Sequence, residues 1–183
     1  MIGKSLVMAA AATAAAGTIV APSAASAQTA PVSTIYSAAL NTCMDTSLIS
    51  PEPYTNVSYV YGGPCDGAPA QQFTLQAQSA AGTYEFISAA SGQCVTDYGD
   101  YLSTTHCTGS IPPDRDSDAF TLVPAGTSGQ EYQIELTVTI NPLGTPSCIQ
   151  VFPQPSGAPG PVYKLRQCDA TNADQIFTLS TTP

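Results

Sequence analysis

The sequence contains no tryptophan, one histidine and only four lysines and arginines among its 183 residues. Thirteen acidic residues oppose these four, which gives a formal net charge of −9. A surface of this sign repels nucleic acid and anionic membranes, so neither is expected as a partner. Charged residues make up 9% of the chain, whereas it has 14 glycines and 16 prolines. This composition is typical of a loop-rich β protein.

Signatures of catalysis and metal binding are also missing. His106 is the one histidine, and no Gly-x-Ser-x-Gly motif marks a nucleophile. No Cys-x-x-Cys pair indicates structural zinc. A calcium-binding EF-hand loop that began at Asp114 would require glycine at its sixth position and glutamate at its twelfth, where the sequence has Ala119 and Ala125. We therefore expect no metal and no cofactor, and a small enzyme that uses His106 is the least supported hypothesis.

The first 27 residues have the pattern of a secretion signal. Lys4 supplies the positive start, residues 6–20 form an alanine-rich apolar run, and residues 25–27 read Ala-Ser-Ala, a typical cleavage pattern. The run is too short and too weakly hydrophobic for a good membrane span. The pattern predicts a signal peptide over 1–27 and a secreted, soluble protein whose single domain covers 28–183. Asn56 begins a glycosylation sequon.

The rest of the chain repeats one pattern three times, in units of about 31–79, 80–126 and 127–183. Each unit has a first cysteine, then a second cysteine, then a Phe-Thr-Leu phrase; these are Cys43, Cys65 and Phe73, then Cys94, Cys107 and Phe120, then Cys148, Cys168 and Phe177. Six cysteines in a secreted chain indicate disulfides, and counting alone leaves fifteen pairings open. The repeat favours one bridge within each unit, worth about 3 kcal/mol.

Short apolar or alternating stretches predict strands, and no stretch after the signal has helical periodicity. The predicted strands are 33–37, 57–61, 72–78, 84–88, 119–123, 131–140, 162–166 and 176–180. Within 132–138, Tyr132, Ile134, Leu136 and Val138 alternate with Gln133, Glu135 and Thr137, which predicts one buried and one wet face. One such unit cannot bury its apolar face alone. The three phenylalanines are therefore expected in equivalent positions of a shared core, with Leu75, Leu122 and Leu179 on the same side.

The order of cysteine, cysteine and Gln-x-aromatic resembles the ricin-B-type lectin repeat, over about residues 34–179. The family's phrase is Gln-x-Trp. Here Phe73 follows Gln71 and Phe177 follows Gln175 at that spacing, whereas Asp118 replaces the glutamine of the middle unit. The resemblance implies an all-β fold, the β-trefoil, in which a six-stranded barrel is capped by three hairpins.

In that family each unit can carry a shallow sugar site. The site has an Asp two places after the first cysteine, an aromatic two places before the second, and an Asn just before the glutamine. The Asp positions hold Asp45, Thr96 and Gln150, with Asp97 one place late in the second unit; the aromatic positions hold Gly63, Thr105 and Arg166; the Asn positions hold Ala70, Ser117 and Asp174. No unit is complete. Other aromatics near these positions are Tyr54, Tyr59, Tyr61, Tyr98 and Tyr101, and tyrosine can stack on sugars.

The resemblance implies a non-catalytic, secreted carbohydrate-binding protein whose partner is an extracellular glycan or polysaccharide, with several weak sites adding avidity. The candidate sugar-binding residues are Asp45, Tyr54, Tyr59, Tyr61, Asp97, Tyr98, Tyr101, Gln150 and Asp174. The incomplete sites and the Pro/Gly-rich loop 153–162 support a second hypothesis. A trefoil that has lost sugar binding would act on another secreted protein, for example as a protease inhibitor.

Overall fold

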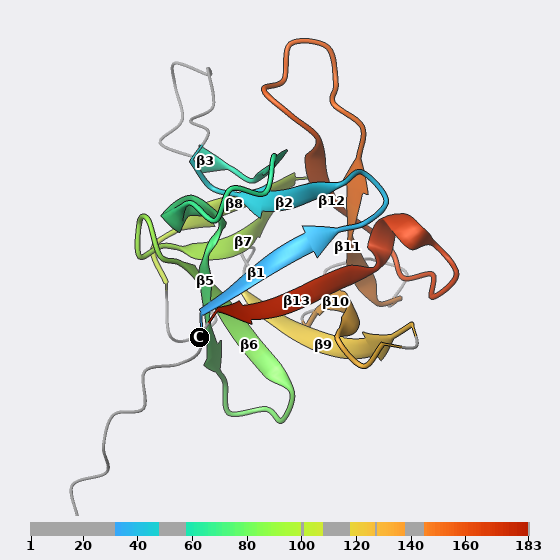
Figure 1. Cartoon of the computed structure of the whole chain (residues 1–183). Helices are drawn as coiled ribbons and strands as arrows, with labels where there is room; N and C mark the ends of the chain where they lie inside the picture. The colour runs from blue at the N-terminus through green and yellow to red at the C-terminus, as the bar shows by residue number, and fades with distance from the viewer. Residues whose placement is uncertain are drawn as a thin grey trace, which may run out of the picture.

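Six strands form the body of the molecule in the computed structural model, which describes residues 32–47, 58–99, 101–107, 118–126, 128–137 and 145–182 (Figure 1). They are β1 (Val32–Ser37), β5 (Phe73–Ala77), β6 (Thr83–Ser88), β9 (Ala119–Ala125), β10 (Glu131–Leu136) and β13 (Phe177–Thr182). They pair antiparallel in the closed ring β1–β13–β10–β9–β6–β5–β1. The ring leaves no unpaired edge, which protects a chain of short strands from edge-to-edge association.

Three hairpins cap one end of this barrel. They are β2 (Thr42–Asp45) with β4 (Tyr61–Gly63), β7 (Cys94–Tyr98) with β8 (Tyr101–Thr105), and β11 (Ser147–Phe152) with β12 (Val162–Gln167). The short β3 (Ser58–Tyr59) pairs with β8, and β12 pairs with β4, so the hairpins contact one another. Figure 1 shows β2, β3, β8 and β12 together at the upper end. Two 3-10 turns, η1 (Pro69–Gln71) and η2 (Ala173–Gln175), precede β5 and β13.

The three units have the same register, which makes the body pseudo-threefold. Each Phe-Thr-Leu strand pairs with the first strand of the following unit, and β13 pairs with β1. The leucines of the phrases lie opposite equivalent residues: Leu75 opposite Phe86, Leu122 opposite Ile134, and Leu179 opposite Ile35. Phe73, Phe120 and Phe177 are fully buried, and the three leucines pack against the same core. The predicted shared core is confirmed.

The disulfides also follow the repeat. Cys43 bonds Cys65, Cys94 bonds Cys107, and Cys148 bonds Cys168, with Cα–Cα distances of 5.1, 4.9 and 4.9 Å. Each bridge lies within one unit, as predicted, and joins the hairpin to the segment that leads back to the barrel. The predicted signal peptide, Tyr54 and the Asn56 sequon lie outside the described residues. No described helix has the length and apolarity to span a membrane.

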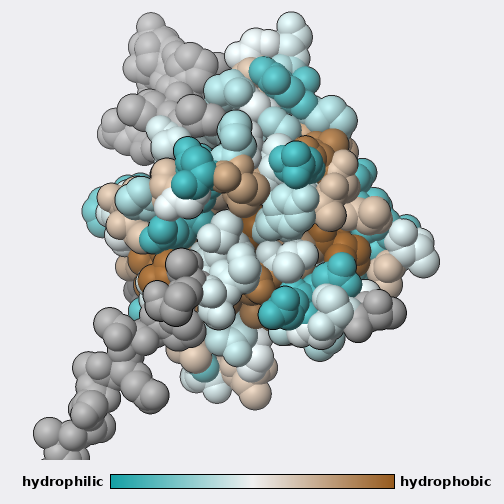
Figure 2. Space-filling model, in the orientation of Figure 1, coloured by the Kyte–Doolittle hydropathy of each residue, from teal (hydrophilic) through white to brown (hydrophobic). Residues whose placement is uncertain are grey.

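One prediction about burial is wrong. Alternation placed Gln133 on a wet face, but its side chain is 6% exposed. Its Nε2 atom donates to the Asp169 carbonyl at 2.9 Å and to Gln175 Oε1 at 3.1 Å. The outward face of β10 is therefore covered at this point by a later segment of its own unit, which includes Asp169 and Gln175, and hydrogen bonds to that segment replace those to solvent. Elsewhere, Figure 2 shows a surface on which apolar patches are small and separated by polar residues.

Candidate functional site

The glutamine of the first Gln-x-Phe phrase holds the first hairpin in place. Gln71 is 1% exposed, and its Nε2 donates to Asp45 Oδ2 at 2.9 Å and to the Pro64 carbonyl at 2.8 Å. Its Oε1 accepts from the Asp66 amide at 3.1 Å. The three hydrogen bonds of the Gln71 side chain are all made to residues of its own unit, so this glutamine is a structural residue that orients the Asp45 carboxylate.

The third unit repeats this network atom for atom. Gln175 Nε2 donates to Gln150 Oε1 at 3.2 Å and to the Gln167 carbonyl at 2.9 Å, and Gln175 Oε1 accepts from the Asp169 amide at 2.8 Å. Gln150 has the place of Asp45, since each lies two residues after the first cysteine of its unit. In the sequence, Asp45 and Gln150 are candidate sugar-binding positions, and nothing there indicates that the glutamines of the phrases bind them.

The first unit offers little room for a sugar at the family's position. Asp45 is 7% exposed, and its Oδ1 accepts from the Ser47 amide at 2.7 Å, so both carboxylate oxygens have internal partners. A Cβ atom at Gly63 would lie 3.1 Å from Asp45 Oδ2. Tyr61 pairs opposite Asp45 but is also 7% exposed. Burial, and then the neighbouring tyrosines, raise the pKa of Tyr61.

A cluster of tyrosines from two units forms on the hairpins instead. Tyr59 of β3 makes edge-to-face contacts with Tyr98 and Tyr101 of the second hairpin, with ring centroids 6.5 and 5.7 Å apart. The ring centroid of the buried Tyr61 is 6.4 Å from that of Tyr59. Tyr98 is 42% and Tyr101 is 37% exposed, and they are the large hydrophobic side chains exposed in the described part of the chain. We call Tyr59, Tyr98 and Tyr101 the tyrosine surface. Asp97, next to it on β7, is buried opposite Leu102.

The lysine and the arginine of the described ranges both lie on β12, and each contacts an aromatic ring. Lys164 Nζ is 4.1 Å from the centroid of the Tyr101 ring and 5.9 Å from that of Phe152. The guanidinium carbon of Arg166 is 5.2 Å from the Phe152 centroid. Since Lys164 pairs with Gln150 and successive side chains alternate, Gln150, Phe152, Lys164 and Arg166 share one face of the third hairpin.

This face borders a hollow of about 810 Å³, which we call the third-unit hollow; it is lined by Gln150, Phe152, Arg166, Asp169, Asn172 and Gln175, among others. Arg166 stands where the resemblance leads one to expect an aromatic, and Phe152 supplies a ring two residues from Gln150. Asp174 is half-buried in η2, and its amide donates to Asn172 Oδ1 at 3.0 Å. Phe152 and Lys164 were not among the predicted site residues, because the register between β11 and β12 cannot be read from a single sequence.

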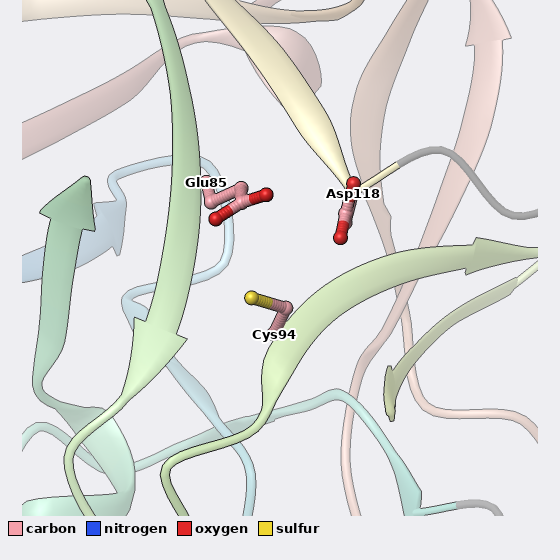
Figure 3. A group of neighbouring side chains, drawn as sticks. All are labelled: Glu85, Cys94 and Asp118. Atoms are coloured by element: carbon pink, nitrogen blue, oxygen red, sulfur yellow. The ribbon is translucent and has the colours of Figure 1, made fainter. Parts of the chain in front are cut away.

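The middle unit differs from the other two in its buried polar pair (Figure 3). Glu85 and Asp118 are each 3% exposed, and their carboxylates lie within 4.8 Å of each other and of Cys94 Sγ. Cys94 is bonded to Cys107, so the group offers two carboxylates and no thiolate. Burial, followed by the Asp118 charge, raises the pKa of Glu85, against a hydrogen bond with Gln78.

No model of a protein family matches the chain, and no curated protein matches it. Several solved structures do match the chain. The Macrolepiota procera ricin B-like lectin in complex with lactose is 14% identical with a TM-score of 0.58, over 85% of this chain and 98% of that one. The Haemophilus ducreyi cytolethal distending toxin is 19% identical with a TM-score of 0.59, over 90% and 89%. The designed threefold-symmetric protein ThreeFoil is 12% identical with a TM-score of 0.58, over 81% and 96%.

These matches define the class of the protein: it is a β-trefoil. The closed ring, the three capping hairpins and the three disulfides, one in each unit, agree with this fold. Identities at this level show the fold alone, and a fold does not carry function by itself.

Proposed function

We propose that the protein is a secreted, non-catalytic carbohydrate-binding protein whose binding surface is the tyrosine surface together with the third-unit hollow. The observation that supports this most directly is the pair of exposed rings, Tyr98 and Tyr101, which lie opposite each other where β7 and β8 meet. Exposing two tyrosine rings side by side forgoes apolar burial, so a function is the simplest reason to keep them.

Tyrosine suits a sugar ligand because the ring stacks on the apolar C–H face of the sugar while the hydroxyl stays in water. The third-unit hollow adds the polar groups that a sugar's hydroxyls need, including the side chains of Gln150 and Asn172. Among the described residues, His106 is exposed beside Cys107, which is in a disulfide, and this gives no support to a catalytic role. The shared fold with a lectin bound to lactose is consistent with the proposal.

The proposal is tested by binding to insoluble polysaccharides and to a broad glycan array, with Tyr98→Ala and Tyr101→Ala as variants. A stacked ring contributes about 0.5–1.5 kcal/mol beyond its buried area, so each variant should lose up to about tenfold in affinity. Tyr36→Ala is the matched control, since Tyr36 lies on β1 and its hydroxyl donates to Asn41. Absence of any binding by the wild type, or unchanged binding by the double variant, would refute the proposal.

A second function is favoured by the shape of the loop between β11 and β12. The side-chain amide of Gln154 donates to the Ala158 carbonyl, and the backbone amide of Ala158 donates to the Pro155 carbonyl at 3.1 Å. The end of the loop is held by a hydrogen bond from the Gly62 backbone amide to the Pro161 carbonyl at 2.7 Å. A loop held in one conformation pays little entropy on binding a protein, as a protease inhibitor requires. Inhibition of a panel of secreted proteases, lost when residues 154–158 are replaced by a Gly-Ser linker, would support this alternative.

A further inference from the structure

The basic residues of this chain are few, and those that the structure describes are placed together. Lys164 and Arg166 project from the same face of β12, about 7 Å apart along the strand. The other two basic residues of the chain, Lys4 and Arg115, lie outside the described ranges. The protein has a net charge of −9, so these two neighbouring cations give the third hairpin a positively charged face on an acidic protein.

The two cations also adjoin the two parts of the proposed binding surface, Lys164 at the tyrosine surface and Arg166 at the third-unit hollow. Lys164 contacts the Tyr101 ring at 4.1 Å, and Arg166 lies 5.2 Å from the Phe152 ring at the mouth of the third-unit hollow. Contact with an aromatic ring positions a cation without neutralising it, because the ring contributes only a quadrupole. The cations therefore keep their charge for a ligand that lies across the rings.

From these contacts we propose that the ligand is an acidic oligosaccharide, one whose sugar rings carry carboxylates, as uronic acids do. This inference rests on the proposed function and names the class of sugar. Aromatic rings bind the C–H faces of the sugars, the Arg166 guanidinium forms paired hydrogen bonds with one carboxylate, and Lys164 supplies a point charge for another. Strong local attraction is needed because the protein as a whole repels a polyanion.

The hollow also fixes the direction of the ligand. Asp169 lines it, and hydrogen bonds from the Thr171 hydroxyl at 2.7 Å and amide at 2.9 Å lower the pKa of that carboxyl. An ionised Asp169 disfavours a second carboxylate deep in the hollow. The carboxylates of the ligand consequently lie toward Lys164 and the tyrosine surface, and neutral hydroxyls face Gln150 and Asn172.

The test compares oligomers of galacturonate, glucuronate and mannuronate with their carboxyl methyl esters, which keep the sugar but remove the charge. Affinity is measured by calorimetry at low and high salt. For at least one oligomer, the acid should bind at least tenfold more tightly than its ester, and this preference should weaken at high salt. Lys164→Gln and Arg166→Gln should each reduce the preference threefold or more, and Arg166→Lys should restore part of the preference that Arg166→Gln loses. Tyr98→Ala, which removes a ring that contacts neither cation, should weaken acid and ester alike.

Two results separate this inference from the proposed function. If neutral glycans or the esters bind as well as the acids, the acidic class is wrong and sugar binding stands. If no glycan of any charge binds, both fail. Thermal unfolding of each variant shows whether a loss comes from misfolding, and a preference for the acids that survives the combined Lys164→Gln and Arg166→Gln substitutions in a folded protein also overturns the inference.

Discussion

Glu85 and Asp118 occupy the positions in the middle unit that Gln133 and Gln175 occupy in the third. Glu85 lies two residues before the partner of Cys94, and Gln133 lies two residues before the partner of Cys148. The third unit forms an amide–amide hydrogen bond at 3.1 Å there, whereas the middle unit buries two carboxyls, each 3% exposed. Replacing Glu85 by Gln should therefore stabilise the protein at neutral pH, and adding Asp118→Gln should install the hydrogen bond of the third unit.

The magnitude follows from what is removed and gained. A net hydrogen bond contributes about 1 kcal/mol, and removing the burial penalty of a charged group contributes about 1–3 kcal/mol. We expect Glu85→Gln to raise the free energy of unfolding by about 1–3 kcal/mol at pH 7. For a domain of this size, each kcal/mol raises the Tm by about 2–4 °C.

The pH dependence gives the sharper readout. The pKa of Glu85 is raised in the folded state, so the folded protein holds this proton more tightly than the unfolded chain does. Wild-type stability is then lost as the pH rises from near 4.5, the ordinary value, through the raised folded value. The advantage of Glu85→Gln should be largest above that range and should vanish below pH 4.5.

Thermal unfolding from pH 3 to 8 measures both effects. The matched control is the reverse exchange, Gln133→Glu, which should destabilise the protein at pH 7 and recover part of this loss as the pH falls. A Glu85→Gln variant with an unchanged Tm at pH 7, or with the same advantage at pH 3 as at pH 7, would show that the buried carboxyl is not a source of strain in the fold.

Three further predictions concern the fold. Phe120→Ala should cost about 3–5 kcal/mol by leaving a cavity at a fully buried position, and chemical denaturation should show it. Gly160→Ala should cost about 1–3 kcal/mol, since a Cβ there would lie 2.3 Å from the Gly62 carbonyl oxygen, while Ser156→Ala in the same loop should change the Tm very little. Gln71→Ala should cost about 2–4 kcal/mol because three hydrogen bonds are lost and the aspartate of the first unit loses its amide donor, a change that proteolysis of the first hairpin should reveal.

The fold could be predicted from the sequence because its two main constraints repeat along the chain. In each of the three units, a phenylalanine follows two cysteines in the same order. This order predicts one core position and one disulfide in every unit. Strands β2, β7, β8 and β11 were not predicted because they lack the alternation of a half-buried strand; β7, for example, has four consecutive buried residues. Gln133 was predicted on the wrong face because its burial depends on a partner far away in the sequence, Gln175.

The candidate site was harder to predict because it is assembled across units. Tyr59 reaches Tyr98 and Tyr101 only because β3 pairs with β8, forty-odd residues away in the chain. Lys164 reaches Tyr101 because the second and third hairpins meet at the cap. The individual tyrosines could be named as candidates from their types, but a single sequence contains no signal for these pairings.

The full-length pairing of β1 with β13, from Val32 opposite Thr182 to Ser37 opposite Phe177, has a practical consequence for engineering. This seam is equivalent to the two hairpin junctions β5–β6 and β9–β10, so a circular permutant that starts at β6 and ends with β5 would retain every strand pair and every disulfide. Since the hairpin cap follows the far end of β1, fusion partners attached at either terminus would leave from the opposite pole and keep the tyrosine surface accessible.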